Sequence, residues 1–471
     1  MHACSVTASS GKSDIRIIVV GASASKAPKA IEAEAARLAS GDISGPVSLI
    51  VDGERFGLVK VRDDDWLVGG EAWRLLGSDV VKLMRASKLK RATVEVGGDK
   101  DQLQALVEGV ILGDYLYTEC RSGKVIKRSK LTVRIPGAAK AIKEGTAVAE
   151  CQNIARSFSD APPNALNPAS FAKRVQVLAR EYGLTCKVTS GIAALTKANF
   201  PGLIQVGQGS KTPPALVELR YVPKKGSAKA KKRLALVGKG MTFDSGGLSI
   251  KPSPGMWEMK NDCGGAAAVL GAMLLIARQQ PKVPVTGYLA LAENMPDGAA
   301  CRPGDIYQAR NGKFIHIDNT DAEGRLILSD VLTYACEQGA THMLDAATLT
   351  GACVVALGMG IAGLMSHDDK WSGQVRAAGL AVGEELWPLP LYGEYRGDLD
   401  HIHADVNNIG GSRWGGALTA GLFLSEFVDH KVKWAHCDIA GPAIRTGGWR
   451  YYAKGMTGFG VRSFARVAAD L

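Results

Sequence analysis

The chain has 471 residues, of which 46% are hydrophobic and 22% are charged. This composition indicates a globular protein of two or three domains, and it excludes an intrinsically disordered chain and, because the 56 glycines have no three-residue period, a collagen-like fibre. The 57 Lys and Arg residues exceed the 46 Asp and Glu residues by 11, so the basic surface permits an acidic partner without requiring one.

Short apolar runs alternate with helical patterns in the first part of the chain. The patterns predict strands and helices in turn, with strands at 15–21, 47–53, 58–62 and 91–98 and helices at 29–41 and 102–115. We therefore expect a small N-terminal α/β domain at 1–138. Residues 139–160 have helical periodicity and end before Pro162-Pro163, which predicts a long connecting helix.

The same alternation continues through 161–471 with more apolar strands. Runs such as RLALVG, TGYLALA and KWAHCDI are nearly continuous in apolar residues, which is typical of strands covered by helices on both faces. Helices are predicted at 264–279, 325–339 and 417–430, and a basic turn at 224–233. The predicted fold class is α/β, with a larger C-terminal α/β domain following the connecting helix.

The sequence favours a cytoplasmic protein. Its nine cysteines are odd in number, scattered and without a CxxC pair, which indicates reduced thiols and argues against a disulfide framework. The first residues, MHACSVTASSGKSD, lack the apolar core of a signal peptide. The uncharged run 346–366 is long enough to cross a membrane, but its glycines and hydroxyl residues favour a buried segment of a large core.

Charged residues gather in three glycine-rich segments of the C-terminal part. These segments are GKGMTFDSGGLSIKPS (238–253), MKNDCGGAA (259–267) and NTDAEGRL (319–326). In extended backbone alternate residues face the same side, so Asp321, Glu323 and Arg325 can converge on one point. Loops at the carboxyl ends of strands are also where open α/β sheets place their sites.

Four of these residues suit a pair of metal ions. The carboxylates of Asp244, Asp262, Asp321 and Glu323 carry a charge of −4 and would raise one another's pKa unless cations neutralised them. Oxygen ligands without Cys or His favour hard or borderline catalytic metals over a structural zinc site. Two such ions about 3.5–4 Å apart can share a water and generate hydroxide at neutral pH. The alternative is that these acids cap helices and form surface ion pairs.

NTDAEGRL resembles the signature of the leucyl aminopeptidase family, the cytosol aminopeptidases or peptidase family M17. The other two glycine-rich segments resemble the family's metal loops, and DIAGPA (438–443) and GMTGFGVR (455–462) match family patterns. The resemblance is strong from about residue 150 to 471 and covers the N-terminal domain only in layout. It implies a macro-domain-like N-terminal domain, a mixed central sheet in the catalytic domain, and a homohexamer.

The resemblance also implies roles for individual residues. Two divalent ions, Zn²⁺ or Mn²⁺ and alternatively Mg²⁺ or Co²⁺, would be held by Lys239, Asp244, Asp262, Asp321 and Glu323. Lys251 and Arg325 would be the catalytic cations, with Arg325 holding a bicarbonate that takes a proton from the nucleophilic water. The substrate pocket would be formed by Met259, Asn319, Thr348, Leu349, Gly351 and Ala440. Lys239 can ligate only as the neutral amine, which requires the metal to depress its pKa.

Other patterns are weighed and set aside. HIHAD (401–405) places two His and an Asp at alternate positions, but with Asn407, Asn408 and Arg413 we expect a hydrogen-bonded loop. GMGIAG (358–363) matches GxGxxG without a strand–turn–helix context. The basic segments 83–91 and 224–233 have no interleaved aromatic residues, so nucleic-acid binding is not expected.

The sequence therefore predicts a metal-dependent leucyl aminopeptidase that acts on peptides with a free N-terminus and prefers apolar first residues. The alternative is a non-catalytic, basic DNA-binding hexamer of the same fold. A two-metal phosphoesterase comes third, because the chain lacks the His-rich ligand sets that are common in such sites.

Overall fold

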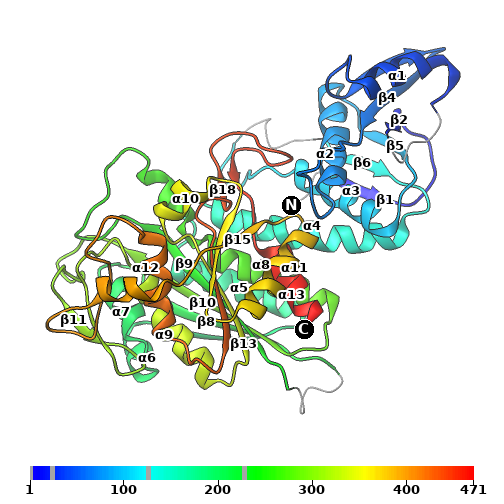
Figure 1. Ribbon diagram of the computed structural model, residues 1–471. Helices are drawn as coiled ribbons and strands as arrows, with labels where there is room; N and C mark the ends of the chain where they lie inside the picture. Colours follow the sequence, from blue (N-terminus) through cyan, green and yellow to red (C-terminus); the bar gives the residue numbers. More distant parts are fainter. Residues whose placement is uncertain (1–3, 22–26, 123–128, 225–230) are drawn as a thin grey trace. The chain divides into compact units, whose positions relative to one another are not determined.

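A computed structural model describes residues 4–21, 27–122, 129–224 and 231–471 of the chain (Figure 1). Contacts divide the chain into two units. The first contains 1–153, 381–383 and 445–455, and the second contains 154–380, 384–444 and 456–471. Helix α4 (Ala139–Asp160), which was predicted at 139–160, begins in the first unit and ends in the second. Most of the predicted basic turn, 225–230, lies outside the described residues.

A six-stranded sheet forms the core of the first unit, in the order β1-β6-β5-β2-β4-β3. Neighbouring strands are parallel except for β3 and β4. Ile17 and Val19 of β2 pack into one apolar cluster and Ile18 into another, because successive side chains of a strand face opposite sides. The strands are β1 (Cys4–Thr7), β2 (Ile15–Val20), β3 (Val47–Val51), β4 (Glu54–Lys60), β5 (Arg91–Glu95) and β6 (Leu131–Arg134).

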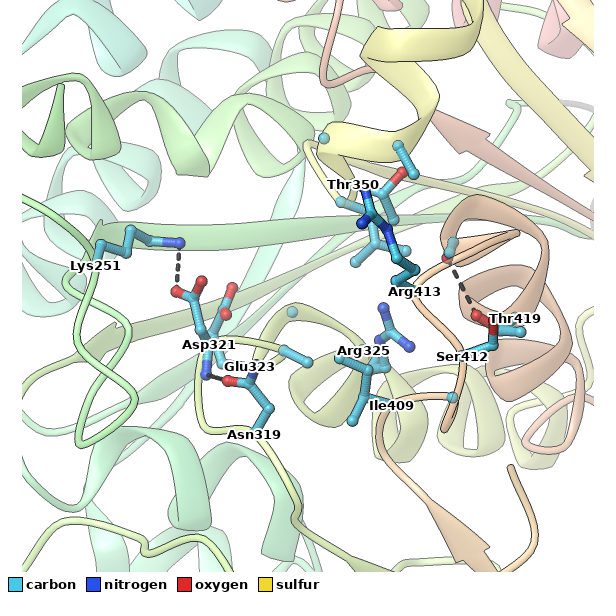
Figure 2. A pocket seen from close by; sticks show the side chains of 17 residues that line it. Lys251, Asn319, Asp321, Glu323, Arg325, Thr350, Ile409, Ser412, Arg413 and Thr419 are labelled. Carbon is cyan, nitrogen blue, oxygen red and sulfur yellow. Dashed lines mark hydrogen bonds and ion pairs between the residues drawn. The ribbon is translucent and has the colours of Figure 1, made fainter. Parts of the chain in front are cut away.

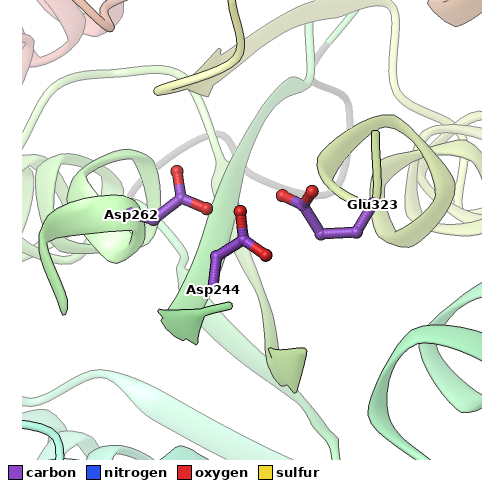
Figure 3. A group of neighbouring side chains, drawn as sticks. All are labelled: Asp244, Asp262 and Glu323. Carbon is purple, nitrogen blue, oxygen red and sulfur yellow. The ribbon is translucent and has the colours of Figure 1, made fainter. Parts of the chain in front are cut away.

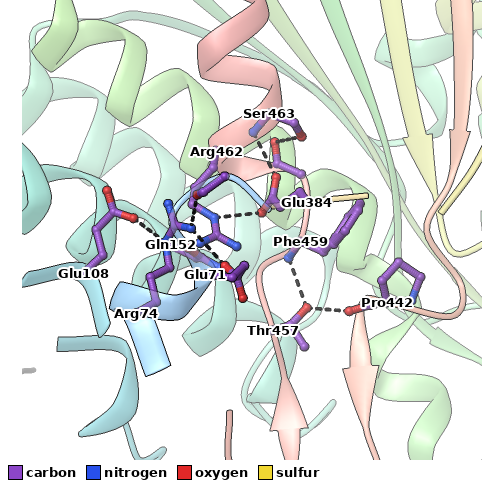
Figure 4. Close-up of polar contacts among 12 residues, drawn as sticks. Glu71, Arg74, Glu108, Gln152, Glu384, Pro442, Thr457, Phe459, Arg462 and Ser463 are labelled. Atoms are coloured by element: carbon purple, nitrogen blue, oxygen red, sulfur yellow. Dashed lines mark hydrogen bonds and ion pairs between the residues drawn. The ribbon is translucent and has the colours of Figure 1, made fainter. Parts of the chain in front are cut away.

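Helices α2 (Glu71–Ala86) and α3 (Lys100–Gly113) of this unit pack closely through glycine. A Cβ on Gly109 would lie 2.0 Å from the Arg74 carbonyl oxygen, so no larger residue fits there. Buried Arg74 donates to Glu71 (2.9 Å) and Glu108 (2.6 Å), as Figure 4 shows. Helix α3 begins at Lys100, two residues before its predicted start, because Asp99 and Gln102 form a capping box there. Helix α1 (Glu32–Ser40) follows a short 3-10 turn, η1 (Lys29–Ile31).

The second unit contains an eight-stranded mixed sheet, in the order β15-β14-β17-β13-β9-β10-β8-β7. The four central strands β17, β13, β9 and β10 are parallel, and β14, β8 and β7 are antiparallel to their inner neighbours. The strands are β7 (Thr185–Ser190), β8 (Ala215–Tyr221), β9 (Leu234–Asp244), β10 (Val285–Asn294), β13 (His342–Ala347), β14 (Ala362–Ser366), β15 (Leu386–Pro388) and β17 (Lys433–Asp438).

Helices cover both faces of this sheet, as the apolar strands predicted. On β9, Gly238 faces α8 (Gly264–Gln279) closely enough that a Cβ would lie 2.6 Å from Ala266 Cα. The side chain of the next residue, Lys239, points to the opposite face and reaches α9 (Gly324–Glu337). In Figure 1, α8 and α13 lie on one side of these strands, and α7, α9 and α12 on the other.

The remaining elements of the second unit surround the sheet. The helices are α5 (Pro168–Tyr182), α6 (Ile192–Lys197), α7 (Pro201–Gly207), η4 (Met256–Cys263), α10 (Gly351–Leu357), α11 (Asp369–Ala381), η5 (Gly393–Leu399), α12 (Gly416–Ser425) and α13 (Val461–Asp470). Two small sheets are formed by β11 (Ile306–Gln308), β12 (Phe314–His316) and β16 (Val406–Asn407), and by β18 (Ile444–Arg445) and β19 (Gly455–Met456).

These elements confirm the predicted α/β class with a smaller and a larger α/β part. The uncharged run 346–366 is the end of β13, then α10 and β14, within the second unit. Within the described ranges, no helix has the length and hydropathy that a membrane span requires. All nine cysteines lie in those ranges, and none forms a disulfide.

Candidate active site

Three buried carboxylates meet where central elements of the second unit end. Asp244 is the last residue of β9, Asp262 lies in η4 just before α8, and Glu323 directly precedes α9. One oxygen from each lies within 4.8 Å of the others, and Figure 3 shows the three groups pointing toward one another. Three segments that are distant in the sequence therefore converge, as their glycine-rich motifs predicted.

The Lys239 side chain extends from β9 into this cluster. Its Nζ lies 2.9 Å from Asp262 Oδ2 and 2.8 Å from Glu323 Oε1, and it donates to the Thr348 carbonyl oxygen (3.0 Å). The side chain fits because residue 324 is glycine: a Cβ there would lie 2.6 Å from Lys239 Cε. Gly324 of the EGR motif thus makes room for the lysine of the GKG motif.

Lys251 pairs with the remaining carboxylates. Its Nζ lies 2.8 Å from Asp244 Oδ2 and also forms an ion pair with Asp321. The turn that carries Lys251 contains Gly246 and Gly247, both at positive φ (+88° and +65°), a region that favours glycine. Asp321 is therefore beside the cluster of three carboxylates but not within it.

The pKa values of three of these carboxyls are raised, which is the direction predicted for crowded acids. Burial raises the pKa of the Asp262, Asp244 and Asp321 carboxyls above their usual range, although Lys239 and Lys251 oppose the shift. Burial alone would lower the pKa of Lys239, but the carboxylates of Asp262, Glu323 and Asp244 outweigh it and raise that pKa. Two ammonium groups thus hold four carboxylates together.

The residues present fit divalent metal ions. Among the described side chains, Asp262 Oδ2 and Asp321 Oδ1 are buried and accept no hydrogen bond, although each lies beside a lysine ammonium. Oxygen-rich donor sets of this kind suit divalent cations. A cation that entered here would take over the neutralising charge of the lysines, which frees Lys239 to lose its proton.

A cavity of about 290 Å³ opens on the cluster. Five of the six residues predicted to bind substrate line it, namely Met259, Thr348, Leu349, Gly351 and Ala440. Thr348 also donates to Asp262 Oδ1 (2.6 Å), so it links the pocket wall to the carboxylates. The DIAGPA segment is held in turn by Thr457, whose hydroxyl donates to the Pro442 carbonyl oxygen (2.7 Å; Figure 4).

A second cavity, of about 320 Å³, lies beside the first and is lined by Asn319 and Arg325 (Figure 2). It shares Lys251, Asp321, Glu323 and the 349–351 segment with the first cavity. Arg325 is buried, and it donates from Nη1 to the Asn408 carbonyl oxygen (2.8 Å), while its Nε finds no acceptor among the described residues. Burial lowers its pKa to about 10. A buried guanidinium with free donors is suited to an anion.

Three positioning residues were missed in the sequence. Buried Asp438 accepts from the Leu349 and Ala440 N–H groups (3.2 Å each) and from the Thr350 hydroxyl (2.7 Å). Asp438 could have been identified from its position as the first residue of the DIAGPA motif. Asn408 accepts from Asp318 and Asn319 N–H through Oδ1, and Asn294 donates to Asp244 Oδ1 (2.9 Å). Neither asparagine lies in a segment whose pattern indicated the site.

The structure bears on the patterns that were set aside. His401 stacks on His316 (ring centroids 3.8 Å apart), and His316 Nδ1 lies 2.9 Å from Asn407 Oδ1, so HIHAD belongs to a hydrogen-bonded loop. Within the described ranges, the carboxylates around Lys239 form the one cluster of potential metal-ligating His, Cys, Asp or Glu side chains. GMGIAG follows α10 and ends in the first two residues of β14, in the order helix then strand.

An α/β fold that brings buried carboxylates together beside two lysines, at the edge of a cavity, is typical of a metal-dependent hydrolase. Comparison with known proteins specifies the class. Residues 153–465 match the model of the cytosol aminopeptidase family, catalytic domain. The chain belongs to the cytosol aminopeptidase family, and it is thus an aminopeptidase that depends on divalent metal. The comparisons give no support to the DNA-binding alternative.

Individual relatives agree with this assignment. The chain is 45% identical over 403 residues to "Probable cytosol aminopeptidase" of Aquifex aeolicus, covering 84% of this chain and 81% of that protein. It is 44% identical over 379 residues to the protein of that name in Mycobacterium tuberculosis (78% and 73%). Among solved structures it is similar to the bottromycin maturation enzyme BotP in complex with Mn, with 35% identity, a TM-score of 0.87, and 98% and 99% of the two chains covered.

Proposed function

We propose that the chain is a two-metal leucyl aminopeptidase, which releases leucine and other apolar residues from peptides with a free N-terminus. One observation carries the proposal: Lys239 Nζ lies between Asp262 and Glu323, within 3 Å of each, in a buried cluster that opens on a pocket. A structural ion pair would not require the cluster to line a cavity. A lysine amine among carboxylates is a mixed donor set that suits two ions.

Each charged residue has a proposed role. Lys239, Asp244, Asp262, Asp321 and Glu323 hold the metals, which when bound supply a water of lowered pKa and polarise the peptide carbonyl. Lys251, which pairs with Asp244, stabilises the oxyanion with its ammonium group. Arg325 holds a bicarbonate ion with the N–H donors, such as Nε, that find no acceptor among the described residues.

The first cavity supports a preference for apolar residues. The apolar residues that line it include Met259, Ala440, Ala443, Ile444 and Met456. A leucine side chain buried against these residues gains about 1.5–3 kcal/mol relative to water. An acidic first residue would be desolvated there beside the lining carboxylate of Glu258, which is costly.

Further properties follow from the relatives and the family. The Mn complex of BotP supports Mn²⁺ as one occupant here, with Zn²⁺, Mg²⁺ and Co²⁺ as the other candidates. The names of the curated relatives support a cytoplasmic location. The family resemblance extends to a homohexamer, which sedimentation velocity would test.

The deciding experiment is hydrolysis of leucine amide by the metal-free protein reloaded with Zn²⁺, Mn²⁺, Mg²⁺ or Co²⁺ in turn. We expect release of leucine with at least one metal, and loss of both turnover and bound metal in Asp262→Asn. Asp305→Asn is the matched control, because this half-buried carboxylate pairs with Arg302 and lines neither cavity. No release of leucine with any of the four metals would contradict the proposal.

Blocking the substrate amine tests which end is recognised. Acetylation removes the amine lone pair as a useful ligand, and a site built for a polar group rejects analogues that leave it unpaired. N-acetyl-leucyl peptides should therefore be cleaved at least ~10³-fold more slowly than free ones. Equal kcat/KM values for both would indicate a different metallohydrolase.

A further inference from the structure

The second cavity contains an arginine to which the proposed chemistry assigns no role. Arg413 lies in the loop between β16 and α12, is exposed, and lines the cavity with Arg325. In Figure 2 these two arginines lie on one side of the cavity, and Lys251, Asp321 and Glu323 lie on the other. Arg413 is thus at the end of the cavity that is remote from the carboxylates.

The charges of this cavity are unbalanced at the Arg413 end. Its two carboxylates, Asp321 and Glu323, pair with Lys251 and Lys239. In the described part of the chain, neither Arg325 nor Arg413 forms an ion pair with a carboxylate. The Arg413 guanidinium lies over the ring of Trp414, with Cζ 4.4 Å from the ring centroid. Its five donors remain available for an anion.

The position of the cavity indicates which part of a peptide would reach Arg413. The two cavities share Lys251, Asp321 and Glu323, so the reacting carbonyl lies between them. The apolar cavity takes the first side chain, and the residue after the scissile bond then enters the other. Arg325 is committed to bicarbonate, which leaves Arg413 as the cation that this second residue can meet.

We propose, on the basis of the proposed function, that Arg413 is a specificity-determining residue that binds a carboxylate on the residue following the scissile bond. That carboxylate is either an acidic side chain or the C-terminus of a dipeptide. Arginine binds carboxylates with two parallel N–H donors, and the stacking on Trp414 limits the entropy lost on binding. The enzyme would then favour short or acidic substrates over neutral ones.

The test compares kcat/KM for two pairs of substrates with free N-termini. Leu-Asp-amide against Leu-Asn-amide isolates the side chain, and Leu-Gly against Leu-Gly-amide isolates the terminal carboxylate. We expect a preference of about fivefold for the charged member of at least one pair, near the upper limit for an exposed ion pair. The pair that shows the preference identifies the source of the carboxylate. Raising the salt to 1 M should weaken it, because the Debye length falls to about 3 Å.

Variants separate this role from a structural one. The two substrates of a pair also differ in their leaving group. The ratio of their kcat/KM values in each variant is therefore divided by the same ratio in the wild type, which cancels the leaving-group effect. Arg413→Gln should abolish the preference and Arg413→Lys should retain part of it. Arg466→Gln, which removes an exposed charge from α13, is the control and should retain all of it.

Several outcomes would overturn the inference. It is wrong if neither wild-type preference exceeds about twofold, or if Arg413→Gln lowers all four kcat/KM values by the same factor. If the wild type cleaves all four substrates without regard to charge, Arg413 has no such role and the aminopeptidase assignment stands. If it cleaves none of them with any metal, the proposed function itself fails and the inference fails with it.

Discussion

Gly324 and Lys239 are complementary in shape: the glycine backbone lies where a Cβ would approach three atoms of the lysine side chain, Cε, Cδ and Nζ, to within 2.6–2.7 Å. Glycine at the start of a helix usually serves conformational freedom. Here it makes room for the Lys239 side chain, which extends from the sheet, so the first turn of α9 and the middle of β9 depend on one another.

Gly324→Ala should therefore displace Lys239. Overpacking of this kind costs roughly 1–3 kcal/mol of folding free energy, and we expect lower metal affinity as well because the amine is moved. Urea unfolding and titration of bound metal would measure both effects. Gly298→Ala is the control, since nothing lies within 4 Å of its added methyl group. Equal metal affinity in both variants would contradict the prediction.

Lys251→Met removes the ammonium group that faces Asp244 and Asp321. Loss of one preorganised donor to a developing oxyanion lowers kcat by about 10²–10³-fold. We expect that loss in kcat, measured with leucine amide at saturating metal. Lys431→Met, in an exposed turn, should leave kcat unchanged. A rise in KM alone would mean that Lys251 binds the ground state instead.

Asp438→Ala should loosen the pocket wall without touching the metals. The change leaves the Leu349 and Ala440 N–H groups and the Thr350 hydroxyl without their acceptor, which should cost roughly 3 kcal/mol of stability. We also expect a higher KM for apolar substrates with bound metal retained. Asp438→Asn keeps one acceptor oxygen and should lose less. An unchanged KM in Asp438→Ala would show that the wall does not depend on this residue.

Asp330 should make stability depend on pH. It is buried in α9 and accepts from the Gly202 and Arg310 N–H groups (2.6 and 2.9 Å), but burial dominates and raises its pKa to about 7. The folded protein therefore binds this proton more tightly than the unfolded chain, so its contribution to stability is present at acid pH and lost as pH rises from about 4 to 7. The raised pKa, from 3.8 to about 7, corresponds to about 4 kcal/mol.

Asp330→Asn removes this titration and isolates it. The unfolding free energy of the wild type, minus that of the variant, should fall between pH 4.5 and 8 in urea titrations. Asparagine offers one acceptor oxygen to two N–H groups, so the variant also carries a loss that is constant with pH. Parallel curves for the two proteins would contradict the raised pKa.

Local sequence patterns predicted those helices and strands whose ends are set by nearby residues or whose side chains are mostly buried. The helix at 264–279 has its predicted bounds, because its apolar residues and glycines all face other elements. The helix predicted at 417–430 ends at Ser425, where Glu426 turns to pair with Lys313 and Arg396. Such pairs join residues about 30 to 110 positions apart, which no local period contains.

The candidate site divides in the same way. Residues within motifs, such as Lys239 and Glu323, could be predicted as candidates because the motifs carry charged residues beside glycines, and the structure places these two together. Asp438 and Asn408 accept hydrogen bonds from backbone groups of other segments, and Arg413 is a candidate only because it lines the second cavity. Their side chains are ordinary in the sequence, and only the folded chain shows which groups they face.

The buried Glu71 has a consequence for synthesis of the protein. Two of its partners, Arg450 (3.0 Å) and Tyr451 (2.9 Å), belong to the first unit but are translated more than 370 residues after it. A nascent chain that has only 1–153 outside the ribosome would hold this carboxylate beside Arg74 but without Arg450 and Tyr451. The first unit therefore cannot reach its final packing until translation is almost complete, and a fragment that stops at residue 153 would make a poor stand-in for it.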